Sequence, residues 1–351
     1  MHNLAGFSLA FGLAVIGYYL ADFIGIGLMG MERSPVSPIM MAIVLGVLVR
    51  NTLPLPAMFD AGIKFSMVRL LRLGIILLGM GLSLGQVGEV GLKSLPVVVV
   101  CVIVALVVVT WLSKRIGLSN RLGTLIAAGT GICGATAIVA LAPAINAKDE
   151  ETSYAVASIA LFGMIAMLVY PFLAHWMFDG NAFQIGLFLG TAVHDTSQVA
   201  GSGMVYQQYF GDSEVLDTAM VTKLIRNLGM LLVIPILSVL YHRSSGETTK
   251  APKWWTMVPL FVVGFALMSL LRTIGDMGTP ALGFLSPEQW SAVTGYAATM
   301  AKASLSVAMA AVGLGTSFKG LRRIGFKPLG VGLFSALLVG LVSYSLITLL
   351  Y

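Results

Sequence analysis

Long apolar stretches alternate with short polar and charged stretches along this chain of 351 residues. A helix that crosses the hydrocarbon core of a membrane needs about 20 residues, and the apolar stretches are close to that length. The pattern therefore predicts an all-α polytopic membrane protein of about eleven transmembrane helices in a single domain over residues 1–351. The predicted helices lie near residues 4–28, 36–50, 66–86, 93–113, 121–145, 152–178, 182–205, 215–241, 255–273, 288–314 and 327–350.

Composition agrees with a membrane protein and argues against soluble classes. Hydrophobic residues make up 58% of the chain and charged residues 10%, whereas about a quarter of a soluble domain is charged. No basic stripe with interleaved aromatic residues occurs, so we expect no nucleic-acid partner. Cys101 and Cys133 lie in apolar stretches, which supports neither a disulfide framework nor a zinc site. With no HExxH or Walker A motif either, we expect no metal, no cofactor and no enzymatic activity.

Lys and Arg are divided unevenly between the loops on the two sides of the predicted membrane. Fourteen of the 21 lie in one alternating set of loops, while the opposite set holds only Arg33, Lys93, Lys148 and Arg272. Cytoplasmic loops are enriched in Lys and Arg. We therefore predict a cytoplasmic N-terminus and, with an odd number of helices, a C-terminus on the opposite side.

The chain also resembles itself. The matches, in chain order, are 45–52 with 189–196, 69–74 with 223–229, 95–97 with 258–260, and 127–128 with 297–298. They pair the second to sixth helices with the seventh to eleventh, which gives repeat one at about 36–178 and repeat two at about 182–351. A shift by five helices reverses membrane orientation, as in the inverted repeats of many secondary transporters. Chance similarity between apolar helices is the alternative.

The fifth predicted helix, 121–145, contains three glycines within six residues at midspan. Glycine lowers helix propensity by about 1 kcal/mol, so we predict a break between Gly129 and Gly134, with Thr130, Gly131, Cys133 and Gly134 in the substrate site. Broken backbone at membrane depth must face protein or a water-filled cavity, and the N-terminus of a half-helix attracts anions. A close helix crossing through small residues is the alternative.

The seventh predicted helix, 182–205, contains a run of polar residues between glycines, from Gly190 to Gly203. Such a run is too polar to face lipid, so we predict an unwound or re-entrant stretch in which His194, Asp195 and Gln198 line the substrate site. His194 titrates near neutral pH in water, and Asp195 could take up a proton or a cation. The alternative is that these residues cap a helix end at the membrane surface.

Cations lie within the predicted spans. Lys223 and Arg226 are three residues apart and share one helix face, as do Arg69 and Arg72 in the matched helix. A charge at the bilayer centre costs roughly 2.5 to 3.5 kcal/mol on insertion scales, so such cations usually face a partner or a functional cavity. We predict that Lys223 and Arg226 bind substrate; snorkelling to the membrane surface is the alternative. The match to the fifth helix in repeat two, 300–306, has no glycine but contributes two further predicted site residues, Lys302 and Ser304.

Four stretches, 70–77, 131–137, 190–199 and 223–226, resemble a family of bacterial inner-membrane proteins labelled sulfate exporters, and the resemblance runs over nearly the whole chain. That family is similar to the group of bile-acid/sodium symporters and cation/proton antiporters. The resemblance implies a multi-pass protein of the bacterial inner membrane with an extra first helix before two inverted five-helix repeats. It also implies two crossing broken helices, which the repeat assigns to the fifth and tenth. The tenth lacks a glycine-rich centre.

The favoured function is a secondary transporter, an exporter, of a small anion such as sulfate or an organic sulfonate. The alternative is a cation/proton antiporter in which Asp195 and His194 carry protons, while Lys223, Arg226 and Lys302 are structural counter-charges. A channel or regulator and an intramembrane enzyme are less favoured. The expected partners are the anion, a coupling proton or sodium ion, and membrane lipids; a homodimer is compatible with the sequence.

Overall fold

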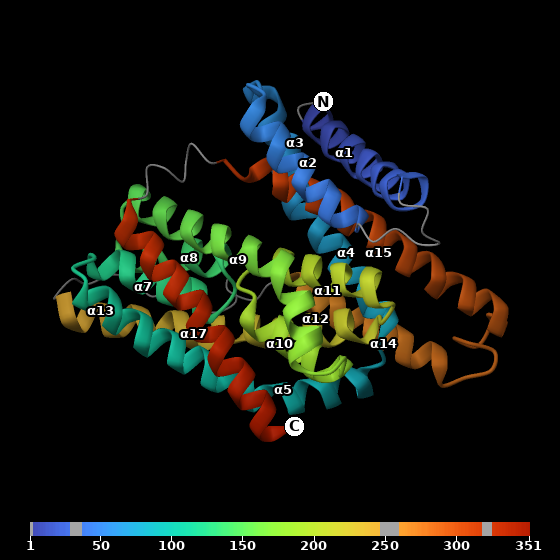
Figure 1. Ribbon diagram of the computed structural model, residues 1–351. Helices are drawn as coiled ribbons and strands as arrows, with labels where there is room; N and C mark the ends of the chain where they lie inside the picture. The colour runs from blue at the N-terminus through green and yellow to red at the C-terminus, as the bar shows by residue number, and fades with distance from the viewer. Residues whose placement is uncertain (1–2, 29–36, 246–259, 318–324) are drawn as a thin grey trace. The chain divides into compact units, whose positions relative to one another are not determined.

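The computed structural model describes residues 3–28, 37–245, 260–317 and 325–351. These residues are almost entirely helical (Figure 1), and the one β-bridge found among them is isolated, between Ala281 and Leu285. The helices of the first half are α1 Leu4–Asp22, α2 Pro38–Thr52, α3 Asp60–Phe65, α4 Leu71–Leu78, α5 Leu84–Val104, α6 Thr110–Arg115, α7 Asn120–Gly131, α8 Ala135–Leu141 and α9 Asp149–Met177. Those of the second half are α10 Ala182–Ala192, α11 Thr196–Phe210, α12 Glu214–Leu228, α13 Met230–Ser245, α14 Leu260–Asp276, α15 Pro287–Gly315 and α17 Phe326–Leu350.

The helical membrane fold predicted from the sequence is confirmed. Each predicted span contains helix, and several spans consist of consecutive helical pieces, as in α5 followed by a π-helical stretch, Ala105–Val109, and α6. Within the described parts of the chain, six helical stretches are long and apolar enough to cross a membrane: Leu4–Asp22, Leu84–Arg115, Asp149–Met177, Glu214–Tyr241, Pro287–Gly315 and Phe326–Leu350. The total of about eleven spans stays a prediction.

Helix starts follow local signals in the sequence. The side chain of Ser37 accepts a hydrogen bond from the backbone of Met40, and Pro38 stands at the first helical position of α2. Asn181 caps α10 by accepting from the backbone of Gln184. Ser286 forms a capping box with Gln289 at the start of α15. Because these side chains satisfy backbone N–H groups that a helix leaves unpaired, the elements begin where the chain supplies such residues.

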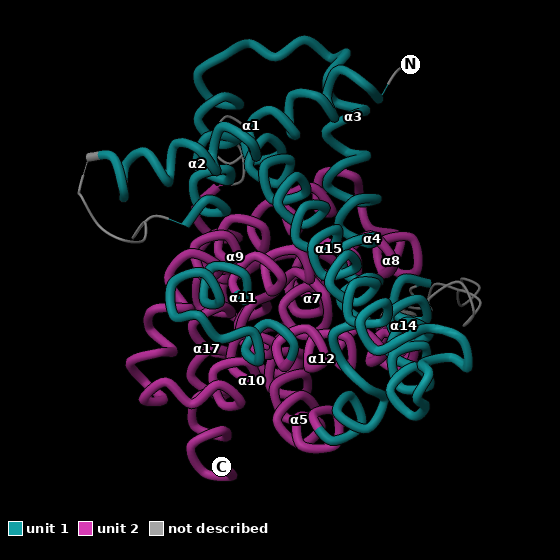
Figure 2. The backbone as a smooth tube through the Cα atoms, turned by 90° about the vertical axis from the view of Figure 1, so that its right-hand side faces the viewer, with its two compact units in different colours: residues 1–89, 203–217, 260–319 teal, residues 90–202, 218–259, 320–351 magenta. Residues whose placement is uncertain are grey.

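The chain divides into two compact units, coloured in Figure 2. Unit 1 comprises residues 1–89, 203–217 and 260–319, and unit 2 comprises residues 90–202, 218–259 and 320–351. Each unit therefore takes segments from both predicted repeats. The rotation that would relate the repeats, and their bounds, stay predictions.

Within unit 1, α2 and α15 cross at two glycines. A Cβ at Gly46 would lie 2.5 Å from the carbonyl oxygen of Ala310, and a Cβ at Gly313 would lie 2.3 Å from that of Ile43. Such small residues let membrane helices approach closely. The crossing continues into an apolar cluster that includes Ala42 and Leu314.

We expect Gly313→Ala to lower the free energy of unfolding by about 1–3 kcal/mol, the usual cost of overpacking. The added methyl group would push against the backbone of Ile43. The control is Gly295→Ala in the same helix, where a Cβ would meet no atom within 4 Å. Because nothing there opposes the higher helix propensity of alanine, we expect this variant to lose no stability. Thermal unfolding of both variants in detergent checks this; equal midpoints would contradict the close crossing.

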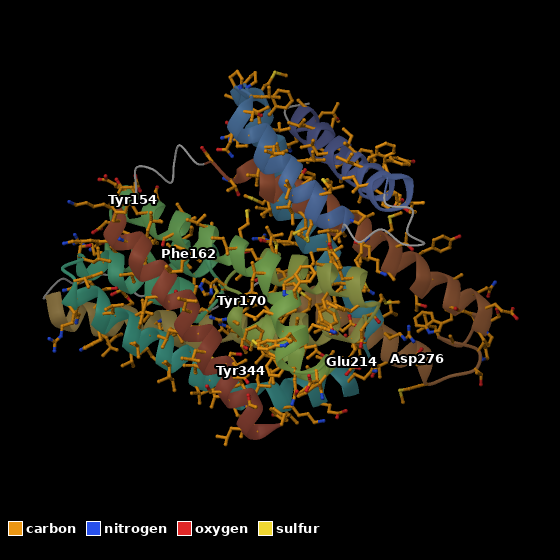
Figure 3. All side chains as sticks on the ribbon, in the orientation of Figure 1. Tyr154, Phe162, Tyr170, Glu214, Asp276 and Tyr344 are labelled. Atoms are coloured by element: carbon orange, nitrogen blue, oxygen red, sulfur yellow. The ribbon has the colours of Figure 1, made fainter. Side chains whose placement is uncertain are left out.

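Within unit 2, α9 packs against α17 through aromatic side chains facing glycines. Figure 3 shows Tyr154, Phe162 and Tyr170 at intervals along α9. A Cβ at Gly332 of α17 would lie 3.0 Å from the ring of Phe162, and a Cβ at Gly340 would lie 3.0 Å from the hydroxyl oxygen of Tyr170. A buried apolar cluster formed mainly by α7, α8, α9 and α13 completes this unit's core.

The expected break in the tenth helix is wrong. The corresponding helix, α15, runs unbroken from Pro287 to Gly315. Its centre is rich in alanine and has neither glycine nor proline, and Ser306 donates its hydroxyl to the carbonyl oxygen of Lys302 one turn earlier, so nothing local interrupts the ladder. The second break lies instead in the seventh predicted helix, between α10 and α11.

Candidate functional site

The fifth predicted helix is broken where its glycines predict. α7 ends at Gly131, a turn follows, and α8 begins at Ala135. Gly134 carries the reversal of the chain with φ 66° and ψ −130°, a conformation that a residue with a side chain adopts only under strain. A Cβ at Gly134 would lie 2.9 Å from Oδ2 of Asp195, so this break touches the break in the seventh predicted helix.

The polar run in the seventh predicted helix forms that second break. α10 ends at Ala192, and α11 begins at Thr196. Oδ1 of Asp195 accepts hydrogen bonds from the backbone N–H of Ser197 at 2.9 Å and from its hydroxyl at 2.6 Å. Asp195 therefore caps α11, as the capping alternative expected, but it does so beside buried residues: His194 and Gln198 are 0% and 3% exposed.

Gln198 fixes this second break to α9. Its Oε1 accepts from the backbone N–H of Asp195 at 3.2 Å, and its Nε2 donates to the carbonyl oxygen of Ala160 at 3.0 Å. Gly163 of α9 leaves room for it, since a Cβ there would fall 2.0 Å from Oε1 of Gln198. Both polar ends of the Gln198 side chain are thus used within the protein.

Arg226 of α12 joins the carboxyl ends of α7 and α10. Its Nε donates to the carbonyl oxygen of Gly131 at 2.8 Å, and its two terminal nitrogens donate to the carbonyl oxygens of Thr130 and Thr191. The last carbonyl groups of a helix lack intrahelical partners and carry the negative end of the helix dipole. A guanidinium group satisfies both needs at once.

Lys223, one turn earlier on the same face of α12, makes the same kind of link. Its ammonium donates to the carbonyl oxygens of Ile132 at 3.4 Å, of Val193 at 3.0 Å, and of His194. Lys223 and Arg226 are both 0% exposed. Snorkelling is therefore not the reason that these two cations lie in an apolar segment.

These cations have little negative charge beside them. Two side-chain ion pairs of the described residues, Arg50–Asp60 and Arg272–Asp276, both lie in unit 1 and involve neither cation. Asp195 is near enough to Lys223 for Coulomb attraction, but its carboxylate bonds to Ser197. Two basic side chains thus face one carboxylate and a set of carbonyl dipoles in a buried site.

Several buried polar atoms near the breaks have no hydrogen-bond partner within the described parts of the chain. They are Oγ1 of Thr130, both ring nitrogens of His194, Oγ1 of Thr222 and Oδ1 of Asn227. Thr222 and Asn227 flank Lys223 and Arg226 on α12, and Nδ2 of Asn227 donates to the hydroxyl of Thr196 at 3.1 Å. Leaving such a group unpaired costs about 1–3 kcal/mol, so their clustering marks this region as one built for a polar ligand or for water.

The structure brings nine of the predicted site residues together: Thr130, Gly131, Cys133, Gly134, His194, Asp195, Gln198, Lys223 and Arg226. The Cys133 thiol donates to Sδ of Met230 on α13. Lys302 and Ser304 are not among the nine: they lie in unit 1, where Lys302 is exposed and Ser304 is partly buried. Arg69 and Arg72 are exposed.

Sequence reasoning missed Thr222 and Asn227. Thr222 lies one residue before Lys223 and Asn227 one residue after Arg226, and each lies four residues from one of the two cations, so the four can form one polar face of α12. This spacing is the sequence signal from which Thr222 and Asn227 could have been predicted as site residues. A cavity of about 390 Å³ in unit 1, beside Arg50 and Asp60, contains none of the predicted site residues.

Comparison with known proteins identifies the family. A family model described as "Conserved hypothetical protein 698" matches residues 5–332. The chain belongs to this family. It is similar to UPF0324 membrane proteins of Bacillus anthracis (32% identical over 346 residues, 97% of this chain and 94% of that protein), Fusobacterium nucleatum (33% over 350 residues, 98% and 97%) and Streptococcus agalactiae (32% over 345 residues, 98% and 96%).

Family membership agrees with the apolar helices, so the chain is a helical membrane protein with bacterial relatives. The names of these relatives say "membrane protein". Sulfate export, kinship with the sodium symporters, insertion in the inner membrane and the orientation of the termini remain predictions.

Proposed function

We propose that this protein is a secondary active transporter of the bacterial inner membrane that exports a small anion, such as sulfate or an organic sulfonate, by alternating access. The observation that carries the proposal is the pair of fully buried cations, Lys223 and Arg226, held where two broken helices meet. Broken helices at membrane depth are typical of substrate sites in secondary transporters.

Charge balance favours an anion. By formal charge, two basic side chains and one acidic one leave the site positive, and an unbalanced charge is expensive where the dielectric constant is low. A guanidinium group has five N–H donors, and the described bonds of Arg226 start from its three nitrogens, one each. Its remaining N–H groups, with the hydroxyl of Thr130 and the imidazole of His194, can donate to the oxygens of an anion.

The antiporter alternative also has one observation in its favour. Lys223 and Arg226 bond to backbone carbonyl groups, as structural counter-charges would. Against it, Asp195, its proposed proton carrier, accepts two hydrogen bonds from Ser197 in a helix cap, so its side chain already has a structural role. We therefore keep the anion transporter as the conclusion.

Thermal unfolding of the purified protein with a panel of anions tests the proposal. At constant ionic strength, we expect sulfate or a small sulfonate to raise the midpoint over gluconate, because a ligand at 100 times its Kd stabilises the folded state by about 2.7 kcal/mol. Exchange of radiolabelled sulfate by proteoliposomes would then establish transport. Stabilisation by cations with no effect of any anion would reject the proposal and favour the antiporter.

A further inference from the structure

The ammonium group of Lys223 occupies a position that resembles a site for a metal cation. Its three contacts are backbone carbonyl oxygens: that of Ile132 comes from the break after α7, and those of Val193 and His194 come from the break after α10. An ammonium group has three N–H donors, so these contacts account for all of them. Lys223 has no N–H left for a substrate.

Carbonyl oxygens at the ends of broken helices have a second common use. Unwound backbone and half-helix carboxyl ends coordinate the coupling sodium ion in several transporter folds, and rings of carbonyls replace the hydration shell of potassium in channels. What these oxygens require is a compact positive charge. The lysine ammonium is such a charge, and here it is attached to the protein.

The rest of the site supports a cation at this point. Asp195, in the second break and beside Gly134 of the first, is within Coulomb range of Lys223. Arg226 satisfies the carbonyl groups of Thr130, Gly131 and Thr191, so the three oxygens around Lys223 depend on Lys223 alone among the side-chain cations of the described residues. Without a positive charge there, three buried carbonyl groups would lose their partner.

We propose that the Lys223 ammonium is the built-in occupant of a monovalent-cation site formed by the carbonyl oxygens of Ile132, Val193 and His194. The protein therefore binds no sodium ion at this point, and removing the ammonium creates a site for sodium or potassium. Lys223 holds the two breaks together rather than contacting the substrate. The consequence for coupling, that anion transport does not use sodium here, rests on the proposed function.

Lys223→Ala and Lys223→Met test this directly. The alanine variant leaves the carbonyl oxygens together with space for an ion and water, whereas the methionine variant fills that space with an uncharged chain of similar length. Thermal unfolding is measured in sodium, potassium and choline chloride at equal ionic strength. We expect the midpoint of Lys223→Ala to rise with each tenfold increase in sodium or potassium but not with choline, and that of Lys223→Met to respond to none of them.

The native protein supplies the second measurement. Its midpoint should be the same in sodium, potassium and choline chloride, since the ammonium already fills the site. The proposal would be overturned if sodium specifically stabilised the native protein and this stabilisation were lost in Lys223→Ala. A Lys223→Ala protein that neither sodium nor potassium stabilises, whether it folds well or poorly in choline, would overturn it too.

These measurements use no sulfate or sulfonate. A cation site in Lys223→Ala can be found even if no anion stabilises the native protein, in which case the proposed function fails and the cation site stands. Conversely, anion binding by the native protein without a cation site in the variant would leave the function standing and remove this inference.

Discussion

Replacing Arg226 by Gln should abolish anion binding and lower stability, in a protein that still reaches the membrane. The substitution removes one of two buried positive charges and leaves carbonyl groups of α7 and α10 without their donor. Each buried group left unpaired costs about 1–3 kcal/mol. We expect the unfolding midpoint to fall and the stabilisation by sulfate or a sulfonate to disappear.

Arg226→Lys separates charge from geometry. It keeps the positive charge but loses the planar fork that reaches several oxygens at once, so part of the stability should return without the anion affinity. Arg72→Gln is the matched control, because Arg72 is also an arginine of a predicted span but is exposed. Arg72→Gln should change neither the unfolding midpoint nor the stabilisation by the anion by much. An Arg226→Gln protein with unchanged anion affinity would refute the assignment and favour the antiporter.

The second large effect should come from Gly134→Ala. Its φ of 66° with ψ of −130° costs about 1–3 kcal/mol for a residue with a side chain. In addition, the new methyl group would lie 3.1 Å or less from three atoms of Asp195, including its Cα. Because the two breaks touch here, we expect a large loss of stability and also weaker anion binding.

Substitutions at two further glycines distinguish the cost of the backbone conformation from the cost of the contact with Asp195. Gly117→Ala, at φ 78° with only the end of the Lys327 side chain within 4 Å, reports the cost of backbone conformation alone. Gly131→Ala lies in the same break but meets ordinary contacts of 3.5 Å, so it should cost little. The unfolding midpoints of the three variants in detergent check this order. If Gly134→Ala were no worse than Gly117→Ala, the contact between the two breaks would be refuted.

The two breaks were accessible from the sequence because each has a local cause. Glycines between Gly129 and Gly134 weaken the helix at midspan, and the polar run around His194 and Asp195 supplies a side chain that caps a new helix start. The membrane spans could also be predicted from the sequence, because a helix needs about 20 apolar residues to cross the hydrocarbon core. The caps Ser37, Asn181 and Ser286 stand directly before the helices they start.

Which helices carry the two breaks was predicted only in part. The repeat assigned the second break to the tenth helix, but similarity between apolar helices says little about local hydrogen bonding, and α15 is rich in alanine and continuous. The polar run in the seventh helix was the better guide, because an unpaired polar group in the membrane must find a partner nearby.

The sequence by itself determined that the chain spans a membrane, that cations lie inside a span, and where two helices lose their regularity. Only the tertiary structure decided what the cations bind. Lys223 and Arg226 bond to backbone carbonyl groups, and because every residue has a carbonyl, such partners leave no trace in residue type. Whether a given carbonyl is free depends on where a helix ends and on what packs against that end, and both are settled by the folding of distant segments onto one another.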